Sequence, residues 1–141
     1  MAVAPRYLAD KSALARLRHP SVSAVLTPLI LAGDVATCGI VELEILYSAR
    51  SHADFARTRA TRALAFPPIP VLQSDFDRAI AVLEALALRG QHRAVSLPDL
   101  LIAAVAERAQ VTVLHYDADY DLVAAVTGQA TQWVVLRGSV P

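Results

Sequence analysis

The sequence predicts an α/β fold in which helices cover both faces of a short parallel sheet, a three-layer α/β/α arrangement. Short apolar runs such as Val111 to Leu114 are almost continuous in apolar residues, as is typical of strands buried on both faces of a parallel sheet. These runs alternate with longer segments of helical periodicity, which is the pattern of β-α-β units. The chain has 141 residues, so we expect a single domain over residues 1–141.

In the first half of the chain, proline and glycine mark the boundaries of the expected elements. Pro20 and Ser21 open a helix that Gly33 ends, because glycine accommodates the left-handed conformation that commonly follows a helix. The expected elements, in order, are a strand over Arg6–Ala9, helices over Ser12–Arg18 and Pro20–Ala32, a strand over Val35–Thr37, an apolar helix over Gly39–Ala49 and an arginine-bearing helix over Asp54–Leu64.

In the second half, the run Pro67-Pro68-Ile69-Pro70 interrupts the helical pattern before an extended Val71-Leu72. We expect Ser74 to cap the next helix, which ends at Arg89-Gly90. Its apolar face is predicted to contain Phe76, Ile80, Leu83, Ala87 and Leu88. The remaining expected elements are a helix over Leu100–Ala109, introduced by Ser96-Leu97-Pro98-Asp99, a strand over Val111–His115, a helix over Asp121–Val126 and a strand over Gln132–Leu136.

The composition limits the possible classes of protein. Hydrophobic residues make up 55% of the chain and the mean hydropathy is +0.44, but no stretch of about 20 residues lacks both charge and proline, so we expect no membrane span. We expect instead a dense core and an exposed apolar patch for a partner.

The N-terminus lacks the apolar segment of a secretory signal, which predicts a cytoplasmic protein. Cys38 is the only cysteine, which excludes an internal disulfide.

The net charge is +0, so contact with nucleic acid would need a local basic patch. One such patch combines His52 with four arginines, namely Arg50, Arg57, Arg59 and Arg62. These side chains form either a solvated helix face or a surface that contacts RNA phosphates.

Four carboxylates lie at the ends of otherwise apolar segments. Asp10 and Asp117 each follow a strand, and the carboxyl ends of parallel strands share one edge of the sheet, where ligands bind. Asp99 lies in the first turn of a helix. There its charge would also stabilise the helix by about 0.3–1 kcal/mol through the helix dipole, without any metal. Glu44 lies in an apolar helix, and periodicity alone does not rank it above Glu42. Carboxylates in apolar surroundings favour a hard divalent cation as their partner.

In order and spacing, the segments that hold these acids resemble the motifs of PIN-domain ribonucleases, and in particular the VapC toxins of toxin-antitoxin pairs. The segments are Tyr7-Leu8-Ala9-Asp10-Lys11-Ser12-Ala13-Leu14, Glu44-Ile45-Leu46-Tyr47-Ser48-Ala49, Pro98-Asp99-Leu100-Leu101-Ile102-Ala103-Ala104 and His115-Tyr116-Asp117-Ala118-Asp119-Tyr120-Asp121. The resemblance covers nearly the whole chain. Each motif alone has little specificity, whereas all of them in order are specific.

The resemblance implies a catalytic site and gives each acid a role in it. Mg²⁺ or Mn²⁺ would be held by Asp10, Asp99 and Asp117, and Glu44 would complete the catalytic set. Ser12 would support Asp10 through its hydroxyl, and Asp119 would assist at the rim. Lys11 replaces a threonine that is frequent in the family, and could contact phosphate together with Arg50, Arg57, Arg59 and Arg62.

The resemblance further implies an endoribonuclease toxin that cleaves tRNA or rRNA in a loop and so inhibits translation. A VapB-like antitoxin would neutralise it by laying its C-terminal segment in an apolar groove and extending a basic side chain to the acids. A homodimer is expected, through the faces of Val22–Leu31 and Ile40–Tyr47. The alternative is a non-catalytic, metal-containing PIN module that binds RNA or a protein. A response-regulator receiver fits poorly, because it needs a lysine after the last strand and the only lysine is Lys11.

Overall fold

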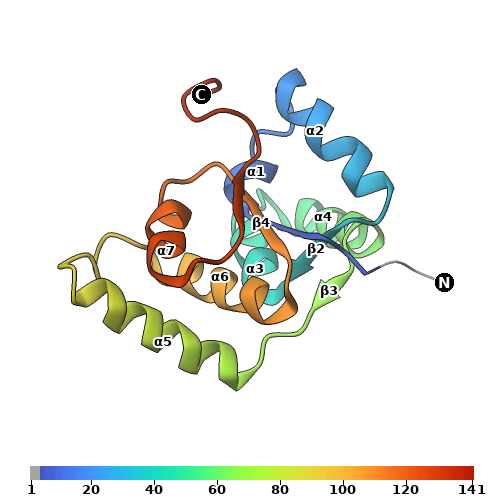
Figure 1. Cartoon of the computed structure of the whole chain (residues 1–141). Helices are drawn as coiled ribbons and strands as arrows, with labels where there is room; N and C mark the ends of the chain where they lie inside the picture. The colour runs from blue at the N-terminus through green and yellow to red at the C-terminus, as the bar shows by residue number, and fades with distance from the viewer. Residues whose placement is uncertain (1–3) are drawn as a thin grey trace.

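The computed structural model describes residues 4–141, and in that part of the chain five parallel strands form one sheet (Figure 1). The strand order is β3-β2-β1-β4-β5. The strands are β1 (Tyr7–Ala9), β2 (Val35–Cys38), β3 (Pro68–Ile69), β4 (Thr112–His115) and β5 (Thr131–Trp133). The predicted fold class is therefore confirmed.

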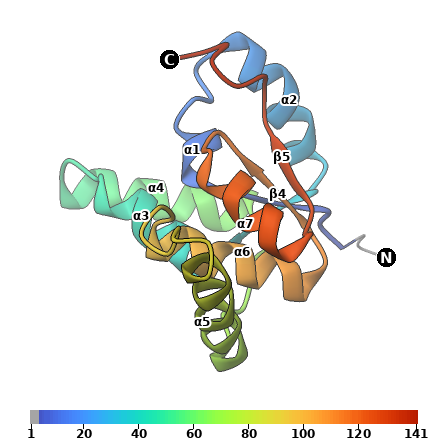
Figure 2. The ribbon, with the colours of Figure 1, turned by 60° about the vertical axis from the view of Figure 1, so that its left-hand side comes forward.

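Helices connect the strands and lie on both faces of the sheet (Figures 1 and 2). Over residues 4–141 they are α1 (Lys11–Leu14), α2 (Pro20–Leu31), α3 (Gly39–Tyr47), α4 (His52–Ala65), α5 (Gln73–Ala87), α6 (Leu97–Ala109) and α7 (Asp119–Thr127). In Figure 2, α3 and α4 extend to one side of the body, and α5 descends below it. None of these helices is both long and apolar enough to cross a membrane.

Alternation along the strands divides the core into two clusters, one on each face of the sheet. Leu8 of β1 and Val113 of β4 pack with residues of α3, α5, α6 and α7. Their neighbours Ala9 and Leu114 point to the opposite face and pack with α1 and α2. All four of these strand residues have no exposed surface, as expected for strands covered on both sides.

The register brings the ends of β1 and β4 together. Leu8 pairs with Ala36 of β2 on one side and with Val113 of β4 on the other. Beyond the end of β1, the Asp10 amide donates a hydrogen bond to the Leu114 carbonyl at 2.9 Å. Residues that follow these two strands therefore share one edge of the sheet, although about a hundred residues separate them in sequence.

The structure corrects two details around the proline run. The extended segment forms a strand at Pro68–Ile69 rather than at Val71-Leu72. This strand tolerates proline because β3 is at the edge of the sheet and needs only one hydrogen-bonded neighbour. The next helix is not capped by Ser74; the Asp75 carboxylate instead accepts a hydrogen bond from the Leu72 amide at 2.8 Å.

The predicted core face of α5 is also wrong, except at Leu83, which is half-buried and packs against the core. Phe76 and Ile80 are 44% and 65% exposed, while the buried residues of this helix are Asp75, Ala79, Val82 and Leu86. The buried Asp75 pairs with Arg108 of α6 at 2.8 Å. Because the charged Asp75 lies on the packed side of α5, hydrophobic periodicity did not predict that side correctly.

Candidate active site

Three carboxylates from distant parts of the chain meet at the edge of the sheet where β1 and β4 end. One oxygen each from Asp10, Glu44 and Asp99 can be chosen so that all three lie within 4.8 Å of one another. Asp10 follows β1, Glu44 lies on α3, and Asp99 lies in the first turn of α6. The structure thus joins Glu44 to the acids, which the sequence alone left open.

Asp10 is 3% exposed and its carboxylate is held at both oxygens. It caps α1, because Oδ2 accepts a hydrogen bond from the Ser12 amide at 3.0 Å. Oδ1 accepts one from the Tyr120 hydroxyl at 2.9 Å. The expected support from the Ser12 hydroxyl takes a different form, since that oxygen accepts the Tyr116 amide hydrogen at 2.9 Å and so ties α1 to the end of β4.

Asp99 is 5% exposed at the start of α6. Its amide donates to the Ser96 hydroxyl, the N-cap of the helix, at 3.3 Å. Burial and the nearby Asp10 raise the pKa of Asp99 to about 9, with further contributions from Asp119 and Asp117. Without a cation this carboxyl therefore holds a proton at neutral pH, and a bound cation would displace it.

Glu44 supplies the observation that tests whether the cluster suits a metal ion. Its Oε1 is shielded from solvent and finds no hydrogen-bond partner among residues 4–141. Burial raises the pKa of Glu44, and Asp10 adds to this effect, whereas the Lys11 ammonium opposes it. A buried carboxylate oxygen without a partner is costly, and an oxygen-rich set of this kind fits a hard divalent cation.

Asp99 also belongs to a second group, with Asp117 and Asp119, whose carboxylate oxygens again lie within 4.8 Å of one another. Asp117 Oδ1 accepts the Asp119 amide hydrogen at 2.9 Å, and Asp119 Oδ2 accepts the Ser96 amide hydrogen at 3.0 Å. The predicted metal ligands Asp10, Asp99 and Asp117 are thus divided between two overlapping groups, with Asp99 in both.

Glu42 does not join the cluster. Its carboxylate pairs with the Arg62 guanidinium at 2.7 Å and accepts a hydrogen bond from the Thr37 hydroxyl. Burial alone would raise the pKa of Glu42, but the hydrogen bonds from Arg62 and Thr37 lower it below its usual value. The two glutamates are therefore distinguished by their partners, and Glu44 is the one that faces the aspartates.

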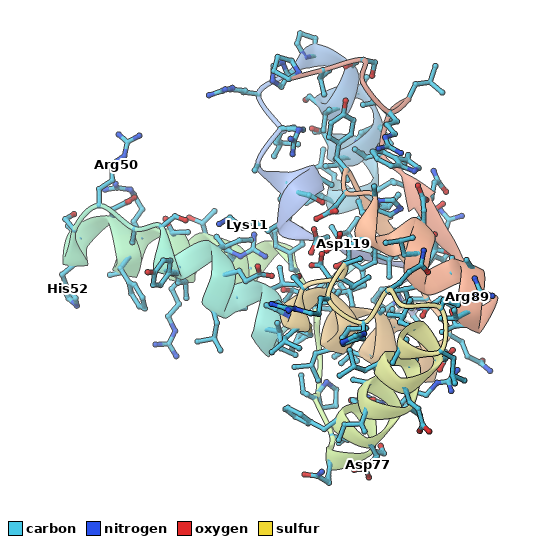
Figure 3. The ribbon with its side chains drawn as sticks, turned by 90° about the vertical axis from the view of Figure 1, so that its left-hand side faces the viewer. Lys11, Arg50, His52, Asp77, Arg89 and Asp119 are labelled. Atoms are coloured by element: carbon cyan, nitrogen blue, oxygen red, sulfur yellow. The ribbon has the colours of Figure 1, made fainter. Side chains whose placement is uncertain are left out.

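One residue of the predicted basic surface, Arg62, is buried. Arg62 is 8% exposed because it pairs with Glu42, so its inclusion among possible RNA contacts is corrected. Arg50, Arg57 and Arg59 are exposed on α4 and on the turn before it. Figure 3 places Arg50 and His52 at the outer end of the α3–α4 hairpin, whereas Lys11 and Asp119 both lie near the centre of this view.

An apolar groove lies between α3, α4 and the start of α5. Its volume is about 820 Å³, and Glu42, Arg59 and Arg62 are the charged side chains that line it. The apolar lining includes Ile40, Leu43 and Leu46 from α3, Phe55, Ala63 and Phe66 from or next to α4, and Val71 and Phe76 from the segment around the start of α5. This is the exposed apolar surface that the composition predicted.

Sequence reasoning missed two residues of the site. Tyr120, for which no role in the site was predicted, donates to Asp10 and also lies 3.2 Å from Asp99 Oδ1. Ser96 caps α6 and holds Asp119 through its amide. The signal for Ser96 was present in the Ser-Leu-Pro-Asp helix start, whereas nothing local in the sequence indicated Tyr120.

Comparison with known proteins shows the family of this chain. The PIN domain family model matches residues 7–126. The ribonuclease VapC51 of Mycobacterium tuberculosis is 44% identical over 138 residues, covering 98% of this chain and 99% of that protein. The ribonuclease VapC21 of the same species is 43% identical over 134 residues, covering 95% and 97%.

Two solved structures share the fold. VapBC-1 from nontypeable Haemophilus influenzae has a TM-score of 0.74 at 14% identity and covers 94% of this chain and 98% of its own. VapBC2 from Rickettsia felis, bound to promoter DNA, has a TM-score of 0.72 at 16% identity and covers 93% and 99%. The family match and the curated relatives together show that this chain belongs to the PIN-domain family, among the ribonucleases of the VapC type.

Proposed function

We propose that this chain is a Mg²⁺- or Mn²⁺-dependent endoribonuclease and the toxin of a VapBC toxin-antitoxin pair. The observation that carries the proposal is the convergence of Asp10, Glu44 and Asp99, whose carboxylate oxygens lie within 4.8 Å of one another. One of these residues, Glu44, keeps a solvent-shielded oxygen without a partner in the described chain. The curated relatives, which are called ribonucleases, support the reaction class.

The chain's own residues have distinct tasks in the proposed reaction. Asp10, Asp99 and Asp117 bind the cation directly or through water, and Asp119 completes the group around Asp99. The bound ion would supply an activated water and neutralise charge on the phosphodiester oxygens. Glu44 Oε1 would orient the attacking water and accept its proton, a task suited to a carboxylate whose pKa is raised by burial. The products would carry a 5′-phosphate and a 3′-hydroxyl.

The RNA is proposed to approach along the basic side of the site. Lys11, whose ammonium donates to the Ser48 hydroxyl at 3.3 Å, would contact the phosphate next to the scissile bond. Arg50, Arg57 and Arg59 would hold more distant phosphates. A tRNA or rRNA loop is the proposed substrate class, because unstacked nucleotides expose their phosphates and base edges, and its cleavage would inhibit translation.

The proposed partner is a VapB-like antitoxin whose C-terminal segment occupies the apolar groove between α3, α4 and the start of α5. The groove has the size and apolar lining that a peptide helix needs, and the exposed Arg59 offers a partner for a carboxylate on that segment. A basic side chain of the antitoxin would extend to Asp10 and Asp99 and neutralise the acids in place of a metal ion.

A homodimer and a cytoplasmic location complete the proposal. Tyr47 and Leu31, at the ends of the two helices expected at a dimer interface, are 91% and 83% exposed, and large apolar side chains exposed to this degree favour burial against a second surface. The cytoplasm is where the proposed RNA substrate and antitoxin are made.

Asp99→Asn tests the proposal directly. The variant should abolish RNA cleavage and growth inhibition, because an amide replaces the carboxylate shared by both acidic groups. It should remain folded and still bind the antitoxin, with any loss of affinity limited to the contact of the basic side chain with Asp99, since the groove does not include Asp99.

The matched control is Asp77→Asn, an exposed position on α5 that lies away from Asp119 in Figure 3. It should cut RNA at the rate of the wild type. If Asp99→Asn also cut at that rate, catalysis by this cluster would be refuted. If neither the wild type nor any variant cut RNA while all of them bound metal and antitoxin, the non-catalytic module would be supported instead. Sequencing RNA 5′ ends after brief expression would identify the cleaved RNA.

A further inference from the structure

A single phenol lies between the two most buried carboxylates of the acidic site. The Tyr120 hydroxyl is 2.9 Å from Asp10 Oδ1 and 3.2 Å from Asp99 Oδ1. Tyr120 has no exposed surface, and Asp10 and Asp99 are 3% and 5% exposed. This hydroxyl therefore connects the end of β1 to the first turn of α6 through a residue of α7.

Packing fixes the position of the Tyr120 ring. Tyr120 is the second residue of α7, and its ring centroid lies 4.9 Å from that of His115 at the end of β4. The His115 ring in turn lies 5.0 Å from the ring of Trp133 on β5. His115 is itself held by the Asp117 amide, which donates to its Nδ1 at 3.2 Å. The Tyr120 ring is thus fully buried and packs against the His115 ring, which in turn packs against Trp133.

Two carboxyl groups that bind one cation together must lie at a suitable separation, and a group that is hydrogen-bonded to both of them can fix that separation. A phenol has one hydrogen and an oxygen that also accepts, so it can connect both groups. Asp10 is already held at its other oxygen by the Ser12 amide. Since every carboxylate oxygen has more than one lone pair, these hydrogen bonds orient Asp10 and Asp99 and leave them able to bind an ion.

We propose that Tyr120 is the positioning residue of this site, and that its hydroxyl sets the separation of Asp10 and Asp99 and thereby the affinity for the divalent cation. This inference rests on the proposed metal-dependent function. Removing a group that hydrogen-bonds a metal ligand typically weakens metal affinity 10- to 100-fold. Tyr120 acts through the two aspartates and is not itself a ligand.

Tyr120→Phe removes the hydroxyl and keeps the ring that packs on His115, so the fold should survive. Mn²⁺ binding measured by calorimetry on the full chain should weaken by about tenfold. At saturating Mn²⁺ the rate of RNA cleavage should return close to that of the wild type, because the ligands themselves are intact. The Tm of the metal-free variant, measured beside the wild type, checks the fold.

Tyr116→Phe is the matched control, because the Tyr116 hydroxyl bonds the Val140 backbone rather than the acids. It should leave Mn²⁺ affinity unchanged. The proposal is overturned if Tyr120→Phe binds Mn²⁺ within twofold of the wild type, or if Tyr116→Phe weakens binding equally. A wild-type chain that binds no Mn²⁺ would instead refute the proposed metal-dependent function, so the two failures are distinguishable.

Discussion

At the scale of single residues, partners decide what each carboxylate does. Glu42 and Glu44 are two positions apart on one helix, yet Glu42 is neutralised by Arg62 while Glu44 Oε1 has no partner among residues 4–141. The sequence indicated the residue types of the site and, through the family resemblance, favoured Glu44. It could not show the Arg62 contact, because that contact joins residues 20 positions apart on different helices.

Asp99 gives the metal-free protein a defined dependence of stability on pH. Its pKa is about 9 in the folded chain and 3.8 in its reference state. Between these values the folded state holds a proton that the unfolded state lacks, so the free energy of unfolding should fall as pH rises from about 4 to about 9. Mn²⁺ should oppose this loss increasingly as pH rises, because the ion competes with the proton.

Urea unfolding at pH 5, 7 and 9 in the presence of a chelator measures this effect. Asp99→Asn removes the titrating group and should show a flatter dependence on pH than the wild type. Equal pH dependence of the two proteins would mean that Asp99 is already ionised in the metal-free chain.

At the scale of elements, the order of strands and helices was predictable, and most boundaries differ by a few residues. The shifts have local causes. The helix expected over Ser12–Arg18 ends at Leu14, and the strand expected after the proline run lies inside that run, at the edge of the sheet. The face of α5 was not predictable, because tertiary packing selected Val82 and Leu86 over Phe76 and Ile80.

A pair of leucines on or next to α5 tests that corrected face. Leu86 has no exposed surface and Leu88, the C-cap residue, is 86% exposed. Leu86→Ala should lower the free energy of unfolding by about 2–5 kcal/mol, because it leaves a cavity in the core cluster that α5 shares with α6 and α7, whereas Leu88→Ala should change it by less than about 0.5 kcal/mol. Chemical denaturation of both variants makes the comparison, and equal losses would contradict the described packing.

At the scale of the whole molecule, the order of the strands brings the residues of the site together. Because β1 lies between β2 and β4, Asp10 and Asp117 leave neighbouring strands at one edge, and the helices that follow β2 and precede β4 bring Glu44 and Asp99 to the same place. The sequence predicted this shared edge from the parallel pattern. It could not predict the position of Tyr120, which depends on how α7 packs over His115. The single domain over residues 1–141 stays a prediction.

The charge of the whole chain is +0, so the affinity for RNA should depend on the local arginines. Replacing Arg50, Arg57 and Arg59 by alanine in the Asp99→Asn background should weaken RNA binding and flatten its dependence on salt, by about 0.7 in the logarithmic slope for each lost contact with single-stranded RNA. Arg89→Ala is the control, at the opposite end of the molecule in Figure 3. Filter binding at several salt concentrations measures both, and identical slopes for all variants would remove these arginines from the interface.

The claim on which this account depends is that Asp10, Glu44 and Asp99 surround one divalent cation. An anomalous difference map from crystals soaked in MnCl₂ tests it most directly. We predict a peak about 2.2 Å from oxygens of Asp10 and Asp99, next to Glu44 Oε1. A map with no peak among these carboxylates, at Mn²⁺ concentrations that support RNA cleavage, would contradict the account.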